Sequence, residues 1–154
     1  MIAGHASAVE RACEIAKRLG ARRAVTLPVS APFHSTLLQP ASERLRARLA
    51  EMTLREPHID LINNVDVAVE TQPARIADAL ARQAARPVRW ADTIRKMRDL
   101  GVTHVVECGP GRVLSGMTKR IAPDIESLAI NDAATLASAL AVLKASAMSA
   151  SAPS

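Results

Sequence analysis

A histidine in a short loop is the residue in this sequence best suited to chemistry. Residues 28–36 read Pro-Val-Ser-Ala-Pro-Phe-His-Ser-Thr, which places His34 directly after Phe33 and two positions after Pro32. Pro32 fixes its own φ and disfavours helical geometry at the residue before it, so the approach to His34 is stiff. An imidazole held by a stiff loop at the end of a strand can serve as a general base. The alternative interpretation is a loop histidine that packs against Phe33 and does no chemistry.

A general base needs an acceptor for its second ring nitrogen as well as a free nitrogen for the proton. That acceptor fixes the tautomer and the orientation of the ring, and it is usually a carboxylate. Backbone carbonyls at a helix C-terminus can also serve, because the last four have no partner inside the helix and carry the negative end of its dipole. Apolar residues at helical spacing predict a helix over residues 73–85 that ends before Pro87. The residues alone leave open whether this helix end reaches His34.

A general base also needs a nucleophile to activate. The Gly-x-Ser-x-Gly elbow of hydrolases and acyltransferases is absent from the sequence. Ser35 or Ser115 could be the nucleophile of a stand-alone hydrolase, but neither lies on such an elbow. The four histidines show no spacing typical of zinc ligands. The Gly-Pro-Gly run at 109–111 lacks the patterns of phosphate-binding loops, so a structural turn is the better interpretation.

Composition indicates one globular domain with an aliphatic core. The 154 residues are 49% hydrophobic, yet they include one Phe, one Trp and no Tyr. The net charge of +5 fits an acidic protein or an anionic substrate better than nucleic acid, since no basic run exceeds two residues and aromatic side chains that could stack on bases are almost absent. We expect no membrane span, because no apolar run approaches about 20 residues, and no secretory signal, because residues 1–10 lack a basic segment followed by an apolar stretch. Cys13 and Cys108 lie far apart, which favours reduced thiols and a cytoplasmic protein.

The expected elements alternate between helices and strands. We expect helices over 5–19, 40–52, 73–85, 90–100, 112–121 and 134–144, and strands over 24–29, 59–65, 103–108 and 127–130. Helical spacing predicts these inward residues for the second, third and fourth helices: Leu45, Leu49 and Met52; Ile76, Leu80 and Ala84; and Trp90, Ile94 and Met97. This order predicts an α/β fold with a mainly parallel sheet, in which working residues gather at the carboxyl ends of strands. The loops that hold His34 and the pair Asn63 and Asn64 both follow an expected strand. Residues 145–154 are rich in Ala and Ser, and we expect them to be frayed or disordered.

Seven short blocks, in their order and spacing, resemble one family. They are similar to the malonyl-CoA:acyl carrier protein transacylases and the acyltransferase domains of fatty acid and polyketide synthases. The blocks are residues 2–5, 27–35, 63–66, 82–83, 87–90, 107–114 and 118–120. Each block is a weak signal, but seven in order are specific, and together they cover nearly the whole chain up to about residue 132.

The resemblance implies a fold and a division of the chain. The family has a large α/β-hydrolase-like subdomain with a parallel sheet and helices, into which a small ferredoxin-like subdomain is inserted. By resemblance, residues 1–27 are the end of the small subdomain and residues 28–132 are the C-terminal part of the large one. Residues 133–154 are then a C-terminal helix followed by a disordered Ala/Ser tail.

The resemblance also implies an activity. The family transfers a malonyl group from coenzyme A to a serine, and then to the phosphopantetheine thiol of acyl carrier protein, without a bound cofactor. His34 matches its general base, and the backbone carbonyl of Gln83 matches the group that orients this histidine. Phe33 matches a position that favours malonyl over branched acyl groups. Asn63 and Asn64 match a polar segment near the site, where they either line the substrate pocket or serve the structure.

The sequence departs from the family in one large respect. The nucleophilic serine, the arginine that binds the malonyl carboxylate and a glutamine of the oxyanion hole lie upstream in the family, and this chain resembles only the C-terminal half. We therefore expect this chain to need a missing N-terminal half and to be inactive alone. We also expect exposed core surface to make the isolated chain self-associate. The alternative is a non-catalytic module that binds acyl carrier protein through a basic surface including Arg112, Lys119 and Arg120.

Overall fold

The computed structural model describes residues 2–150 and divides the chain into two compact units, with the boundary between Arg89 and Trp90. This division differs from the boundaries that the family resemblance implies, at 27/28 and 132/133. Those boundaries concern the subdomains of a longer fold, and they stay a prediction.

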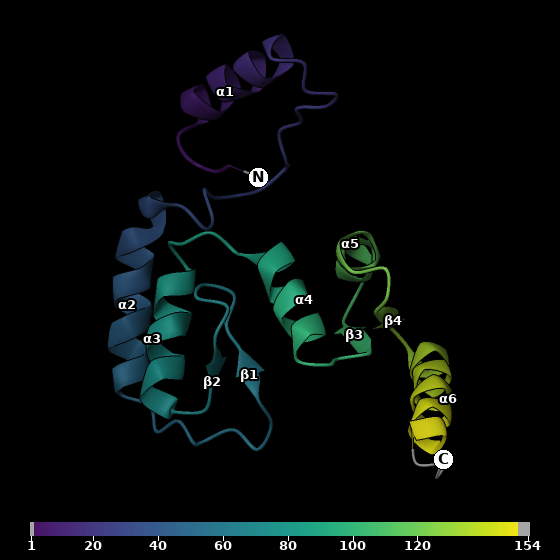
Figure 1. Ribbon diagram of the computed structural model, residues 1–154. Coiled ribbons are helices and arrows are strands. Elements are labelled where there is room, and N and C mark those ends of the chain that lie inside the picture. Colours follow the sequence, from purple (N-terminus) through teal and green to yellow (C-terminus); the bar gives the residue numbers. More distant parts are fainter. Residues whose placement is uncertain (1, 151–154) are drawn as a thin grey trace. The chain divides into compact units, whose positions relative to one another are not determined.

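The first unit is built mainly from helices. Its elements are α1 (Ala6–Arg18), the 3₁₀ turn η1 (Thr36–Leu38), α2 (Gln39–Ala50), β1 (Leu61–Ile62), β2 (Val69–Glu70) and α3 (Pro73–Gln83). Proline stands in the first turn of both α2 and α3, where its missing N–H costs nothing. Helices α2 and α3 lie side by side (Figure 1). The short side chain of Ser42 reaches across from α2, and its hydroxyl donates to the carbonyl of Ala81 at 2.6 Å.

The inward faces expected for α2 and α3 are confirmed in part, since Ile76 is buried and Leu49 is half-buried. On α3 the side chains of Ala79 and Ala81 are buried, whereas Leu80, expected to point inward, is 44% exposed. Leu45 and Met52, expected to be the inner face of α2, are also exposed. The expectations for Leu45, Met52 and Leu80 were therefore wrong, because the buried side of α3 carries Ala79 and Ala81 and turns Leu80 to solvent.

The strand expected over residues 24–29 is also wrong. This segment has no regular secondary structure, and Val25, Leu27 and Val29 are each more than half exposed. A strand exists through hydrogen bonds to a neighbouring strand, and none of the strands in the described part of the chain pairs with this segment. Instead, the backbone N–H of Val29 donates to the carbonyl of Leu27, which forms a tight local turn.

A short hairpin replaces the single strand expected over residues 59–65. Strand β1 keeps only two of those residues, and it pairs antiparallel with β2, which the sequence pattern did not predict. The Cα partners are Leu61 with Glu70 and Ile62 with Val69. The polar turn between the two strands carries Asn63 and Asn64.

The second unit contains a parallel pair of strands. Its elements are α4 (Trp90–Asp99), β3 (His104–Cys108), α5 (Val113–Ile121), β4 (Glu126–Ile130) and α6 (Ala133–Ala150). Strands β3 and β4 run parallel, from the pair His104 and Glu126 to the pair Cys108 and Ile130, and α5 makes the crossover. Helix α6 runs six residues past the expected end at Lys144, and residues 151–154 of the expected disordered tail lie outside the described part.

The core of this second unit is aliphatic, as its composition predicts. Ile94, Ala122 and Ile125 are almost completely buried, and Trp90 and Met97 of α4 pack against them. The predicted inward face of α4 is therefore confirmed. With its helices and parallel strand pair, the chain has the mixed α/β class that the sequence predicts. The small ferredoxin-like subdomain stays a prediction. In residues 2–150, no helix has both the length and the apolar character that a membrane crossing requires.

Candidate active site

His34 is held by the C-terminal end of α3. Its ring Nδ1 lies 2.9 Å from the carbonyl oxygen of Gln83, and its backbone N–H donates to the carbonyl of Ala84 at 3.3 Å. A carbonyl oxygen can only accept, so the hydrogen bond requires a proton on Nδ1 and leaves Nε2 with its lone pair in the neutral ring. The helix end that the sequence left unplaced thus reaches His34. This geometry is what a general base needs, whereas the catalytic roles of His34 and Gln83 stay predictions.

The other two free carbonyls of the same helix end also have partners. The carbonyl of Ala81 accepts from the buried hydroxyl of Ser42, and the carbonyl of Arg82 accepts from the backbone N–H of Ala85. A helix normally leaves its last four carbonyls without a partner inside the helix. Here the carbonyls of Ala81, Arg82, Gln83 and the C-cap residue Ala84 all have a partner, and His34 makes two of the four bonds. The ring of His34 therefore serves as a helix cap as well as a candidate base.

The loop around His34 combines a strained backbone conformation with hydrogen bonds between near neighbours in the sequence. His34 is half-buried and has a φ of +61°, a left-handed conformation that is uncommon outside glycine and is often found at functional sites. The hydroxyl of Ser35 donates to the carbonyl of Pro32 at 2.7 Å, and the backbone N–H of Phe33 donates to Ala31. Phe33 is 48% exposed, so its ring is not buried in the core of this chain.

Asn63 shapes the turn of the β1–β2 hairpin. Its side chain is buried, and its Oδ1 accepts from the backbone N–H groups of Val65 at 3.1 Å and Asp66 at 2.7 Å. The carbonyl of Asn64 accepts from the backbone N–H of Arg89 at 3.0 Å. These bonds give Asn63 a structural role. Contact of either asparagine with a substrate stays a prediction.

A network of ion pairs joins the β1–β2 turn to α3. The sequence patterns did not predict this network. Arg82 donates to both carboxylate oxygens of Asp66, at 2.8 and 2.5 Å, and its Nε donates to Asp78 at 2.6 Å. The Arg82 guanidinium holds the pKa of Asp66 below its usual value, and hydrogen bonds from Arg46 and then Arg82 do the same for the pKa of Asp78. The four-residue spacing of Asp78 and Arg82 on one helix was a signal for this pair, but only the fold brings Asp66 to it.

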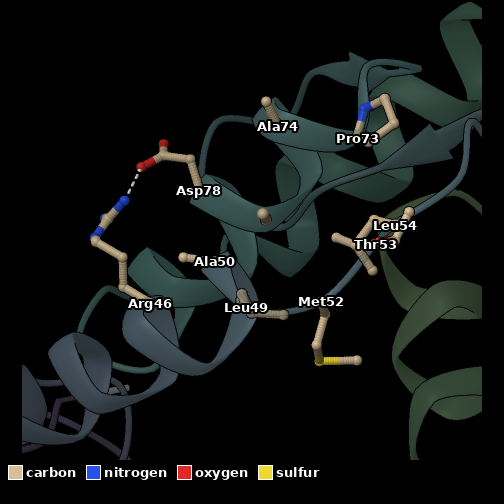
Figure 2. A pocket seen from close by; sticks show the side chains of 10 residues that line it. Arg46, Leu49, Ala50, Met52, Thr53, Leu54, Pro73, Ala74 and Asp78 are labelled. Atoms are coloured by element: carbon tan, nitrogen blue, oxygen red, sulfur yellow. Dashed lines mark hydrogen bonds and ion pairs between the residues drawn. The ribbon is translucent and has the colours of Figure 1, made fainter.

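A groove lies along the N-terminal half of α3, away from the end that holds His34. It encloses about 520 Å³ between the last turn of α2 and the start of α3, and the ion pair of Arg46 with Asp78 crosses its edge (Figure 2). Leu49, Met52 and Pro73 are among the lining side chains. The groove therefore does not include the candidate base.

In the second unit, Ser115 and the Gly-Pro-Gly turn at 109–111 both make hydrogen bonds that stabilise the local structure. The hydroxyl and the N–H of Ser115 both donate to the Glu107 carboxylate, at 2.5 and 2.8 Å, so Glu107 caps the start of α5. The side-chain amide of Asn131, oriented with its nitrogen toward the Gly-Pro-Gly turn, donates to the carbonyls of Gly109 at 2.8 Å and Gly111 at 3.1 Å. Within residues 2–150, no three His, Cys, Asp or Glu side chains are grouped to hold a metal ion.

Fold and site together define a class of protein. An α/β chain that orients a half-buried histidine with a helix-end carbonyl, and leaves Nε2 available, is suited to group transfer or hydrolysis by general-base catalysis.

Comparison with known proteins narrows this class. No protein-family model matches the chain. Over 140 residues the chain is 46% identical to the malonyl CoA-acyl carrier protein transacylase of Salmonella typhimurium, which covers 91% of this chain and 45% of that protein. The protein of the same name from Bacillus subtilis is 40% identical over 144 residues, covering 94% of this chain and 45% of the relative.

Solved structures agree with the sequence relatives. The crystal structure of an acyl-carrier-protein S-malonyltransferase from Burkholderia pseudomallei matches with a TM-score of 0.85 and 54% identity, over 89% of this chain and 45% of that one. A malonyl-transacylase in complex with a holo type II polyketide synthase acyl carrier protein matches with a TM-score of 0.86 and 43% identity, over 89% and 44% of the two chains. The resemblance to malonyl-CoA:acyl carrier protein transacylases is thus confirmed. The chain spans 45% of the length of the curated relatives named here.

Proposed function

We propose that this chain is the C-terminal portion of a cytoplasmic malonyl-CoA:acyl carrier protein transacylase of fatty acid or polyketide synthesis, and that it supplies the general base. The observation that carries the proposal is the 2.9 Å hydrogen bond between His34 Nδ1 and the carbonyl of Gln83. That bond fixes the tautomer in which Nε2 can take a proton. The similarity in sequence and fold to transacylases supplies the reaction class.

The chemistry of His34 in this proposal is one of proton transfer at Nε2. Nε2 takes the hydroxyl proton of a serine outside this chain while the serine oxygen attacks the malonyl thioester carbonyl. The proton then passes to the sulfur of coenzyme A as the carbon–sulfur bond breaks. In the second half, Nε2 takes the proton of the phosphopantetheine thiol, the sulfur attacks the malonyl ester, and the serine oxygen recovers the proton. The negative end of the α3 dipole favours the imidazolium that forms in each half.

The residues next to the base supply selectivity in this proposal. Phe33 directly precedes His34, and its ring is exposed enough to border a bound acyl group. A bulky ring there leaves little room for an α-methyl branch, and one methyl group is worth about 1–3 kcal/mol in a pocket. Asn64, in the polar turn between β1 and β2, is a second candidate to line the pocket for the acyl group. Malonyl-CoA and the phosphopantetheine arm act as substrates, and no bound cofactor is required.

A chimera tests the proposed function directly. The matched segment of the Salmonella typhimurium relative is replaced by this chain, and malonyl transfer from labelled malonyl-CoA to holo acyl carrier protein is measured. We expect transfer by the chimera and a roughly 10²–10⁴-fold loss with His34→Ala, the range of general-base catalysis. A folded chimera without transfer, or one in which His34→Ala has no effect, would contradict the proposal. The chain alone is expected to transfer nothing, because it lacks the nucleophile elbow.

A second candidate is the non-catalytic module that binds acyl carrier protein. Arg112, Lys119 and Arg120 are exposed at the start and the end of α5, where they present positive charge to solvent. Such a surface suits an acidic carrier protein, and binding through it weakens as salt screens the charges. Binding of holo carrier protein to the chain alone at low salt, without transfer by the chimera, would favour this candidate over the first.

A further inference from the structure

The last turn of α3 is attached to the rest of the first unit on two sides. Ser42, on α2, is 3% exposed, and its hydroxyl donates to the carbonyl of Ala81 at 2.6 Å. Asp66, in the hairpin turn, binds the guanidinium of Arg82 with both carboxylate oxygens. The two attachment points are the two residues that directly precede Gln83.

This arrangement bears on His34 because hydrogen bonds are directional. The bond from Nδ1 to the carbonyl of Gln83 weakens steeply when the angle or the distance departs from its optimum. A helix end without external partners frays, since its last carbonyls have no partner inside the helix. Holding the peptide group of Ala81 and the side chain of Arg82 limits the movement of this turn, and therefore also holds the direction of the Gln83 carbonyl.

Ser42 has a second connection to His34 through the chain. Residues 34–42 form one continuous segment, which contains η1 and the start of α2. The segment is fastened to the end of α3 at both of its ends, by His34 to Gln83 and Ala84 and by Ser42 to Ala81. The His34 ring and the Gln83 carbonyl, which form the hydrogen bond at Nδ1, are thus both held by the contacts between residues 34–42 and the end of α3.

We propose that Ser42 and Asp66 are positioning residues for His34: they hold the last turn of α3 so that the Gln83 carbonyl keeps the ring in its Nδ1–H tautomer. The proposal deepens the proposed function, on which the catalytic consequence rests. Ser42 and Asp66 act through the helix end rather than on the reacting atoms. Asp66 is the weaker of the two, because its carboxylate is partly exposed to solvent.

Nitrogen NMR of the His34 ring in the full chain tests the proposal without any enzymatic activity. We expect wild-type chain to show a protonated Nδ1 and slow exchange of its proton. Ser42→Ala and Asp66→Ala should move the ring toward the Nε2–H form and speed proton exchange, roughly tenfold for Ser42→Ala, the equivalent of one typical hydrogen bond. Ser42→Thr, which keeps the hydroxyl, should restore the wild-type signal.

Two control variants remove similar contacts elsewhere. Ser138→Ala deletes a hydroxyl that donates to the carbonyl of Ala134 within α6, and Glu51→Ala deletes an exposed ion pair with Arg48 on α2. Both should leave the His34 ring signals unchanged. Amide spectra show whether each variant is folded, and Asp66→Ala keeps the test decisive if Ser42→Ala does not fold.

The outcomes separate the positioning role from the proposed function. In the chimera, Ser42→Ala should lower kcat with little change in KM, and Ser42→Thr should recover kcat. If the ring responds as described but the wild-type chimera transfers no malonyl group, the positioning role stands and the proposed function fails. Wild-type tautomer and exchange rate in folded Ser42→Ala and Asp66→Ala would overturn the positioning proposal.

Discussion

Replacing Asn63 by alanine should open the turn between β1 and β2. The Asn63 side chain is 5% exposed, and its Oδ1 accepts the backbone N–H groups of Val65 and Asp66 at 3.1 and 2.7 Å. The turn also holds Val67 at a φ of +61°, which is costly for a β-branched residue. Alanine keeps none of the side-chain contacts, so the turn loses the group that holds its strained conformation.

The size of the effect follows from the two lost acceptors. Each hydrogen bond contributes about 1 kcal/mol net, so the free energy of unfolding of the first unit should fall by about 2 kcal/mol. Asn63→Asp is the matched control, because its carboxylate can still accept both N–H groups. That variant also replaces Nδ2, which donates to the carbonyl of Ala68 at 3.4 Å, by a carboxylate oxygen that can only accept. We expect Asn63→Asp to lose less stability than Asn63→Ala, because both turn N–H groups keep their acceptor.

Two measurements check this prediction. Urea denaturation of the wild-type chain and both variants gives the change in the free energy of unfolding. Hydrogen exchange at the amides of Val65 and Asp66 reports the turn itself, and both should lose protection in Asn63→Ala but not in Asn63→Asp.

Two results would refute the structural role of Asn63. One is an Asn63→Ala chain with wild-type stability and protected amides at Val65 and Asp66. The other is an Asn63→Asp chain as unstable as Asn63→Ala, which would mean that the acceptor oxygen is not what matters. If Asn63→Ala were stable but abolished malonyl transfer by the chimera, the residue would act on the substrate instead.

Three further predictions concern the base, the core and the cap. Gln83→Ala should leave the tautomer of His34 unchanged by NMR, because the backbone carbonyl and not the side chain makes the contact; a changed tautomer would contradict this. Ile94→Ala should lower the free energy of unfolding of the second unit by about 2–5 kcal/mol in urea titrations, while Leu100→Ala, at a half-exposed side chain, should cost much less. The pKa of Glu107 is lowered by hydrogen bonds from the start of α5, so its stabilising effect is present above about pH 4.5 and is lost as the pH falls through the lowered pKa. The stability difference between wild type and Glu107→Gln should therefore shrink below that pH, and a constant difference down to pH 2 would contradict the cap.

Much of the local structure could be predicted because its cause is local. The apolar periodicity around Ile94 predicts helix α4 and its buried face, and both are confirmed. Proline and glycine mark where several helices begin and end. Residues 24–29 show the limit of such patterns, since their apolar character is compatible with a strand but a strand needs a partner that the described chain does not provide.

The sequence by itself determined that His34 stands on a stiff loop, that a helix ends before Pro87, and that the blocks resemble malonyl transacylases. Only the tertiary structure decided that the carbonyl of Gln83 meets Nδ1, and that Ser42 and Asp66 hold the turn from which this carbonyl projects. Conformational preferences and spacing act over a few residues, and so they are legible in the sequence. The hydrogen bond of the candidate base joins residues 49 positions apart, and its geometry follows from the packing of α2 against α3, which no local pattern encodes.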